Sequence, residues 1–474
     1  MQYAVQVISR RTLIQTATMA AWGQALPGAT PPLSALNAKM PLEERIRRIE
    51  TFVHERYYDE KGILYSHWNF EGERPNRRED FHRDTVSPLG VSMADWFNYE
   101  NSPMIAGIFL ASQCYRYEAT REPQALEYAA RAFRSIDTIF KLAESQAGKP
   151  PMLMQRAGSV DPNDRFEPRP GWICKPYAQS LTMQTSSEQN FGPMWGLYVY
   201  RQHAPADVRK RIDYIITSVA TLWRQNRYTI NFFGENWNLE QSMPRAQRHM
   251  PVWMWINRLA FEVSGDPVFK KEFERIHSLF GAMPTARETN YAMGRRKYLS
   301  TEDRAFHDKE VVVADFLIDL HPEAKDQYLR SMEGWWDFSK IGMRPDLFSY
   351  YYIDLDTVTG EWAPVKKSLK PRSLWNSPYM MQNGTFPVCW GEIASRRVLS
   401  SAMVARRGSR FAEPAKQFAQ QVFSRLDKEH LRYMIDPDNS LEPELAFLTN
   451  LLSGDGLAYM PAAYWYGRRH GLWS

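Results

Sequence analysis

Six segments of the chain carry an apolar residue at every third or fourth position, with polar residues between them. In one of them, Val208, Ile212, Ile215 and Val219 step by four, three and four. This spacing places the apolar side chains on one face of a helix and predicts amphipathic helices that cover a core. The six segments are 42–57, 126–140, 208–222, 269–280, 328–335 and 411–426.

A second set of six segments is apolar or aromatic on nearly every side, which is the pattern of a helix buried all round. These segments are 101–118, 191–202, 244–263, 309–320, 388–406 and 457–470. Five of them lead through a short turn, such as Ser-Gly-Asp-Pro at 264–267, into the next amphipathic segment. A proline near the first helical position is a helix start signal.

The last buried segment has no amphipathic segment after it, and the first amphipathic segment has no buried segment before it. These two complement each other if the chain closes into a ring. The alternation therefore predicts an all-α fold, an (α/α)6 toroid with six inner and six outer helices, formed as a single domain by residues 41–474. An open helical solenoid would need more regular repeats, and two helical domains would need a linker; both stay open as alternatives.

The N-terminal segment has a different character. Arg10 and Arg11 precede a modestly apolar run, and Gly23 and Ala25 fit a small-residue cleavage site. The pattern predicts a twin-arginine-type signal peptide over 1–29 and a short linker over 30–40, and hence a periplasmic or secreted protein. No later segment reaches about 18 uninterrupted apolar residues, so we expect no membrane-embedded part in the mature form.

The composition of the chain excludes several classes of function. A chain with 44% hydrophobic and 24% charged residues is globular, and a net charge of +5 is too mild to indicate a nucleic-acid-binding protein. The three cysteines match no metal-binding spacing, and no phosphate-binding or dinucleotide-binding glycine motif occurs. We therefore expect no metal and no cofactor. The composition gives no indication of an oligomeric state.

Six long loops separate the predicted hairpins, and all of them lead into the N-terminal ends of buried helices. In a ring they collect on one face, around the central funnel, where a site is expected. Amide, carboxylate, guanidinium, imidazole and aromatic side chains dominate their ends, which suits the hydroxyl groups and apolar faces of sugars. The candidate substrate-binding residues are His82, Arg83, Glu188, Gln189, Glu235, Trp237, Arg245, Tyr291 and Arg295.

Basic residues are concentrated in the fourth and fifth of these loops. The fourth includes Arg295, Arg296 and Lys297, and the fifth includes Lys366 and Lys367. Arginine pairs with carboxylates through two parallel hydrogen bonds, so these loops favour an anionic oligo- or polysaccharide as the partner.

The helical plan resembles the six-hairpin toroids of carbohydrate-active enzymes, a grouping with glycoside hydrolases, sugar epimerases and the all-helical alginate and glucuronan lyases. Those lyases neutralise the uronate carboxylate with an amide or histidine and use a tyrosine, with an arginine nearby, as base and acid. The resemblance implies catalytic roles for Asn190, His249, Arg296 and Tyr298. It departs from the alginate lyases at Arg248, where they carry an asparagine.

Two chemistries follow. The preferred one is β-elimination, in which donors aimed at the uronate carboxylate stabilise the developing enolate while a tyrosine removes the C5 proton. The alternative is a glycoside hydrolase that uses paired carboxylates, with Glu188 and Glu235 as candidates. A non-catalytic glycan-binding protein is the third interpretation.

Overall fold

The computed structural model of the chain describes most of the helical framework and parts of the loops. It describes residues 32–81, 91–145, 147, 171–177, 185–232, 235–240, 243–280, 298–300, 308–340, 343, 347, 352–355, 362–364, 390–432, 447 and 449–473. Of these, 230–232, 235–237, 243–248, 280, 298–300, 352–355, 362–364 and 390–392 are described by their backbone alone. The predicted signal peptide, 1–29, lies outside the described residues.

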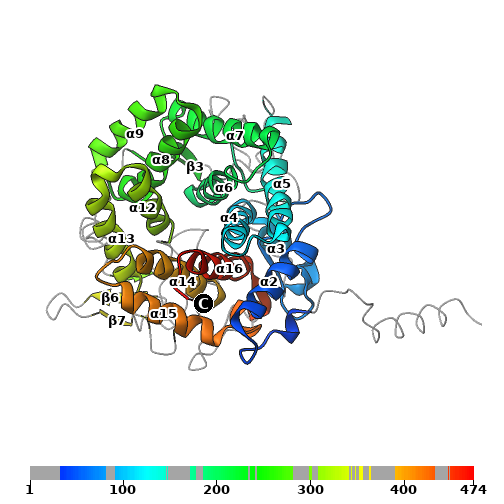
Figure 1. Ribbon diagram of the computed structural model, residues 1–474. Coiled ribbons are helices and arrows are strands. Elements are labelled where there is room, and N and C mark those ends of the chain that lie inside the picture. The colour runs from blue at the N-terminus through cyan, green and yellow to red at the C-terminus, as the bar shows by residue number, and fades with distance from the viewer. Residues whose placement is uncertain are drawn as a thin grey trace, which may run out of the picture.

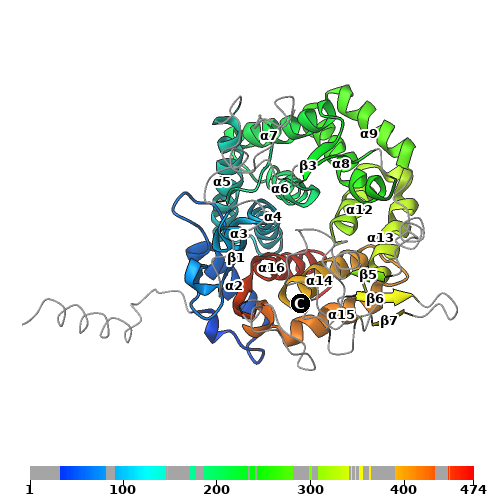
Figure 2. The ribbon, with the colours of Figure 1, turned by 180° about the vertical axis from the view of Figure 1, so that it is seen from behind.

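The helices form two concentric rings, as Figures 1 and 2 show from opposite sides. The inner ring consists of α4 (Ser102–Thr120), α6 (Ser187–Tyr200), α8 (Met243–Ser264), α12 (Asp308–Leu320), α14 (Trp390–Arg406) and α16 (Gly454–Arg469). The outer ring consists of α2 (Leu42–Arg56), α5 (Pro123–Ser145), α7 (Ala206–Gln225), α9 (Pro267–Phe280), α13 (Lys325–Ser339) and α15 (Ala412–Arg425). The predicted (α/α)6 toroid is confirmed.

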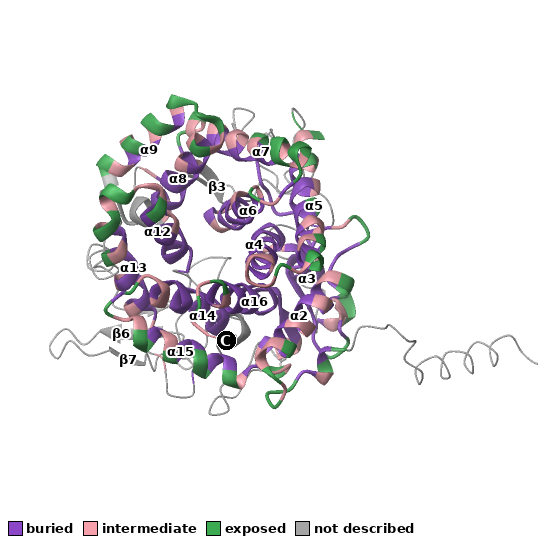
Figure 3. Ribbon diagram, in the orientation of Figure 1, coloured by how far each residue is buried: buried purple, intermediate pink, exposed green. Residues whose placement is uncertain are grey.

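The burial of each helix follows the pattern that predicted it. Every residue of α4 from Ser102 to Arg116 is buried, because outer helices and neighbouring inner helices surround it. In α5 the buried residues recur at helical spacing, as at Ala125, Tyr128, Ala129 and Ala132. Figure 3 shows the same contrast around the ring, with buried inner helices and outer helices exposed along one side.

Inner helices α4 and α6 touch through their backbones. A Cβ atom added at Gly107 would lie 2.0 Å from the Gly192 carbonyl carbon, and one added at Gly196 would lie 2.2 Å from the Gly107 oxygen. Since real Cβ atoms do not approach backbone so closely, only glycine permits this contact. We call Gly107, Gly192 and Gly196 the glycine seam.

Around α8 the inner helices are held apart by rings. Trp255 of α8 contacts Phe191 of α6 and Phe316 of α12, with ring centroids 5.8 and 5.6 Å apart. Tyr198 of α6 also contacts Phe316, at 5.9 Å. Trp255 and Phe191 are fully buried. We call the contacts of Phe191, Tyr198, Trp255 and Phe316 the aromatic side of the ring.

The two ends of the helical chain close the ring against each other. Trp465 of α16 donates to Glu50 of α2 at 2.7 Å, and Arg468 donates to Glu43 at 2.9 Å. Burial raises the pKa of the Glu50 carboxyl. The strand β1 (His67–Asn69) pairs antiparallel with β8 (Leu451–Ser453) on one edge and with β2 (Arg74–Pro75) on the other. The first outer helix therefore completes the last hairpin, as the helix count required.

Several elements were not anticipated. Helix α6 begins at Ser187 and α16 at Gly454, several residues before the predicted starts, and the loops contain α3 (Met93–Tyr99) and short strands. Among the strands are β3 (Thr229–Phe232), β4 (Glu235–Asn238), β5 (Tyr298–Ser300), β6 (Tyr352–Leu355) and β7 (Trp362–Pro364). Strand β6 lies between β5 and β7, so the fourth and fifth loops share one sheet.

The segment expected as a linker packs on the toroid where it is described. Leu33 and Leu36 are buried, and the Ser34 amide donates to Glu73 Oε1 at 3.0 Å. No helix within the described part of the chain is both long and apolar enough to cross a membrane.

Candidate active site at the mouth of the inner ring

Charged side chains meet where the inner helices begin, and we call this region the mouth. Contacts between chain segments place the starts of several inner helices together: Lys309 of α12 reaches Glu188 of α6, and Arg396 of α14 reaches Asp455 of α16. These residues lie in the first or second turn of their helices. Positive helix N-termini therefore surround the mouth, which favours carboxylates there.

The most buried group at the mouth is built from three helices. Asp308, the first residue of α12, accepts a short hydrogen bond at Oδ2 from the Tyr459 hydroxyl of α16. Asp455 of α16 accepts two hydrogen bonds at Oδ2 from Arg396, from Nε at 2.8 Å and from Nη2 at 2.5 Å. Arg396 Nη1 lies 3.5 Å from Asp308 Oδ1. One guanidinium thus stands between two carboxyl groups.

Burial alters the acidity of this group. Burial raises the pKa of the Asp308 carboxyl even though Arg396, Tyr459 and Lys309 each act to lower it. The Tyr459 hydroxyl has a pKa well above its usual value, because it is buried and faces Asp308. A carboxyl group whose proton is held more tightly than usual is the kind of group that general acid catalysis uses.

A second group at the mouth joins α6, α8 and α12. The Lys309 ammonium, only 2% exposed, forms a short ion pair with Glu188 and donates to Ser187 Oγ at 3.4 Å. Ser187 Oγ lies 2.9 Å from His249 Nδ1 of α8. The Glu188 side chain is 23% exposed, more than its partner.

A third ion pair completes the mouth near α4. Lys175 is buried and donates to Glu100 at 3.1 Å, and its ammonium lies 5.7 Å from the centre of the Trp96 ring. His67 lies close to Glu100 and Asp455, and burial lowers its pKa. The described charged residues of the mouth thus form ion pairs between chain segments.

The structure brings several predicted site residues to the mouth. Glu188 and His249 belong to the second group described above, and Gln189 donates to Asn101 Oδ1 at 3.0 Å. Asn190 is fully buried, and its amide nitrogen donates to Thr185 Oγ1 at 3.1 Å and to the Ser186 carbonyl at 2.8 Å. Both hydrogens of the Asn190 amide are thus used within the start of α6.

Other predicted residues are placed by their backbone or not at all. Glu235 and Trp237 lie in β4, Tyr298 lies in β5, and Arg245 lies in the first turn of α8. The remaining predicted residues, His82, Arg83, Tyr291, Arg295 and Arg296, lie outside the described residues, as do the lysines at 366 and 367.

The sequence analysis overlooked the residues that make the most buried group. Lys309, Arg396 and Tyr459 lie within segments predicted as buried helices, whereas Asp308 and Asp455 lie at the ends of the long loops before them. One signal was available: a charged residue inside a helix that is otherwise apolar all round has no solvent to face, so it must face another charge or a ligand.

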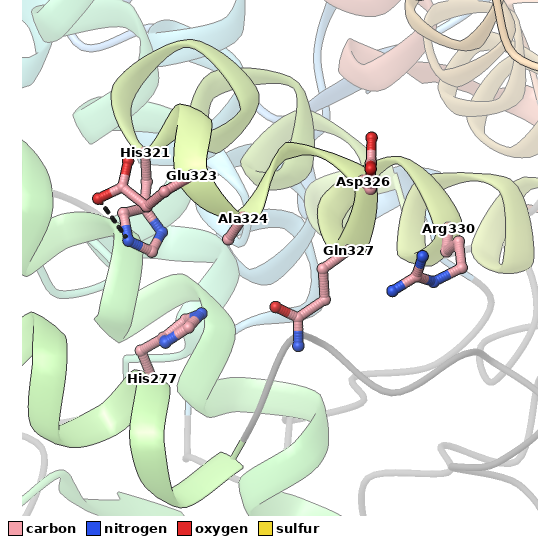
Figure 4. A pocket seen from close by; sticks show the side chains of 7 residues that line it. All are labelled: His277, His321, Glu323, Ala324, Asp326, Gln327 and Arg330. Carbon is pink, nitrogen blue, oxygen red and sulfur yellow. Dashed lines mark ion pairs between the residues drawn. The ribbon is translucent and has the colours of Figure 1, made fainter.

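A separate pocket of about 500 Å³ lies on the outer ring, between α9 and the start of α13. Figure 4 shows the residues that line it, among them His277, His321, Glu323 and Arg330. The ring centroids of His277 and His321 are 5.0 Å apart, and His321 Nε2 lies 3.1 Å from Glu323 Oε1. Because His321 follows the last residue of α12, this pocket is at the opposite end of that helix from Asp308, about 18 Å away.

No three histidine, cysteine, aspartate or glutamate side chains within the described ranges are arranged to hold a metal ion. This holds for the outer pocket as well as for the described part of the mouth.

No protein-family model matches the chain, and no curated protein sequence matches it. Among solved structures, it is similar to a glycosyl hydrolase family 88 protein from Bacteroides vulgatus, at a TM-score of 0.47 and 8% identity, over 91% of this chain and 100% of that one. It is also similar to cellobiose 2-epimerase from Bacillus thermoamylovorans B4167, at a TM-score of 0.47 and 11% identity, over 90% of this chain and 98% of that one. At these levels of similarity, neither match carries information about the chemistry of this chain.

Proposed function

We propose that this protein is a carbohydrate-active enzyme that hydrolyses glycosidic bonds, with Asp308 as general acid and Glu188 as the second carboxylate. The observation that carries the proposal is the buried Asp308 carboxyl at the mouth, hydrogen-bonded by Tyr459 and with a raised pKa. The alternative chemistry of the sequence analysis is thereby preferred to β-elimination.

Hydrolysis of a glycoside needs one carboxyl group that still carries its proton and one that has lost it. The burial of Asp308 supports the first role, since it raises the pKa of the carboxyl and so favours the protonated form. Glu188 suits the second role because it is paired with the Lys309 ammonium and is more exposed than Asp308. Glu188 would assist a water molecule or attack the sugar directly.

The described residues offer less support to β-elimination. Tyr459 lies beside an arginine, with the Arg396 guanidinium 5.5 Å from its ring centre, but its raised pKa makes it a poor base. The amide hydrogens of Asn190 are already bonded within α6, so they are not available to a uronate carboxylate. A lyase would instead depend on Tyr298 and Arg296.

The substrate we propose is a glycan that enters the funnel from the mouth. The basic residues of the fourth and fifth loops favour an anionic glycan, whereas the described cations of the mouth, such as Lys175 and Lys309, are already paired with carboxylates. The substrate panel must therefore contain both neutral and uronate-containing oligosaccharides.

The test follows reducing ends and ultraviolet absorbance together across that panel. New reducing ends without absorbance from an unsaturated uronate support hydrolysis, and the appearance of that absorbance favours the lyase. Binding without turnover favours a glycan-binding protein.

The residue assignment is tested with Asp308→Asn and Glu188→Gln. Loss of a general acid should lower kcat about 10²–10⁴-fold. Asp326→Asn and Glu413→Gln, made at exposed outer-ring positions, are the matched controls and should retain full activity. Full activity in Asp308→Asn would overturn the assignment.

A further inference from the structure

Asp308 and Asp455 compete for one guanidinium, and the competition is unequal. Arg396 directs two of its nitrogens, Nε and Nη2, at Asp455 Oδ2, at 2.8 and 2.5 Å. Its third nitrogen, Nη1, is 3.5 Å from Asp308 Oδ1, which is an ion-pair distance but too long for a strong hydrogen bond. Asp308 Oδ1 makes no hydrogen bond with any described residue.

We propose that Asp455 is a positioning residue that holds Arg396 away from Asp308 and so keeps the proton on Asp308. This inference rests on the proposed function, because it explains how the assigned acid stays protonated beside an arginine. A guanidinium that formed two parallel hydrogen bonds with Asp308 would strongly favour its ionised form.

The layout of α16 makes this arrangement rigid. Asp455 and Tyr459 are four residues apart, so they lie on the same face of the helix, one turn from each other. Tyr459 fixes Asp308 Oδ2 while Asp455 fixes the guanidinium. All four side chains are at most 5% exposed, and each polar contact is therefore formed away from water.

Other charged groups lie next to Asp308 or on helices near it. Helix α12 itself contributes Lys309 and Glu310, which act in opposite directions on Asp308. Helix α6 contributes Glu188, which engages Lys309, and α8 contributes His249, which engages Ser187. Helix α13 ends nearby with Asp337 and Lys340, which pair with each other at 3.4 Å. None of these groups bridges Asp308 to a second carboxylate as Arg396 does.

The proposal predicts shifts of opposite sign. In Asp455→Asn the guanidinium loses its charged partner and turns to Asp308, so the basic limb of the pH profile of kcat/KM should move to lower pH by at least one unit. In Arg396→Met the same limb should move to higher pH. In the double variant the effect of Asp455→Asn should shrink to that of losing the Asp455 charge alone, because no guanidinium remains to be released.

A second readout is independent of turnover. The carboxylic C=O stretch of protonated Asp308 is assigned in the infrared spectrum by its loss in Asp308→Asn, and its disappearance with rising pH reports the ionisation of Asp308 directly. Asp455→Asn should move this titration to lower pH, and Arg396→Met should move it to higher pH.

The outcomes separate the two proposals. If the wild-type chain cleaves no glycan but the infrared titrations shift as described, the proposed function fails and the positioning role of Asp455 stands. If the titration in Asp455→Asn stays in place or moves to higher pH, the positioning role is overturned. Should Asp455→Asn not fold, the absence of an upward shift in Arg396→Met would also overturn it.

Discussion

Between α4 and α6 the backbones meet at the glycine seam, whereas between α6, α8 and α12 rings on the aromatic side fill the space. At the glycine seam, Cβ positions would overlap backbone atoms, so no atom can be added. On the aromatic side, the single residue Trp255 of α8 contacts both α6 and α12. Few atoms can therefore be removed from it without leaving a space between the helices. The ring of six helices thus contains two kinds of packing. The glycine seam is sensitive to an increase in side-chain size, and the aromatic side is sensitive to a decrease.

The largest effect is expected on the aromatic side. Trp255→Ala should lower the free energy of unfolding by about 3–5 kcal/mol, because a fully buried indole leaves a cavity that its neighbours cannot fill. Urea-induced unfolding measures the change. Trp255→Phe keeps a ring in place and is the control, with a clearly smaller loss. A cost below about 1 kcal/mol for Trp255→Ala would mean that other contacts hold α8 in the ring.

At the glycine seam the damaging change is an addition. Gly192→Ala should cost about 1–3 kcal/mol, since the new Cβ would lie 2.4 Å from the Met104 carbonyl oxygen. Gly265→Ala is the control, because its φ of +69° disfavours alanine while the space around it is open. A gain in stability in Gly192→Ala, as the higher helix propensity of alanine alone would give, would contradict the close approach.

An intermediate loss of stability is expected at the mouth, where Lys309 of α12 pairs with Glu188 of α6. Lys309→Met removes the partner of Glu188 and should cost about 1 kcal/mol, a modest value because the Glu188 side chain is partly exposed. Adding Glu188→Gln should recover part of that loss, since no charge is then left without its partner. Hydrogen exchange at the start of α6 and α12 locates the change. If Lys309→Met and the double variant exchange hydrogen at these helix starts at equal rates, the ion pair between Lys309 and Glu188 does not hold the two helices together.

The smallest effect is a loss of stability at acidic pH, and it is expected at His54 of the outer helix α2. Burial, with Arg131 and Arg134 nearby, lowers the pKa of His54 to about 4, and its ring stacks on Tyr128 at 3.8 Å. The unfolded chain takes up a proton at its ordinary pKa of about 6.5, whereas the folded chain does not, so stability falls as pH drops from there toward 4.

His54→Phe keeps the stacked ring and removes this proton uptake. The difference in Tm between neutral pH and about pH 5 should therefore shrink in the variant. The variant His470→Phe, at another half-buried histidine whose pKa is about 3, is a parallel test. An unchanged pH dependence in both variants would place the acid sensitivity at other titratable groups.

The ring could be predicted because its physical cause is visible in single helices. The stripe of 208–222 and the burial of nearly all of 101–118 both follow from how much of a helix faces water, and the count of such helices favours closure. The predicted starts of α6 and α16 were wrong because the first turns of these helices contain polar residues, such as Glu188 and Asp455. A polar stretch of this kind resembles a loop in the sequence, and only the packing at the mouth explains it as part of a helix.

The site was less accessible to prediction. Asp308, Arg396 and Asp455 come from three hairpins, and no spacing along the chain reveals that one guanidinium lies between two carboxyl groups. Arg396 lies in a segment predicted to be buried by packing, and Asp308 and Asp455 lie at loop ends that gave no sign of a shared partner. Glu188 and His249 were found because they lie in the first two turns of their helices, where a ring gathers side chains.

The contact between the first outer helix and the last inner helix has a consequence for synthesis. Ile46, Ile49, Phe52 and Val53 of α2 leave the ribosome early, yet α16, which carries Trp465 and closes over this helix, is made last. Pairings so distant in sequence slow folding and leave apolar surface uncovered on the nascent chain. The growing polypeptide is thus an open arc of hairpins until α16 is made, and the apolar face of α2 that α16 covers stays open until then.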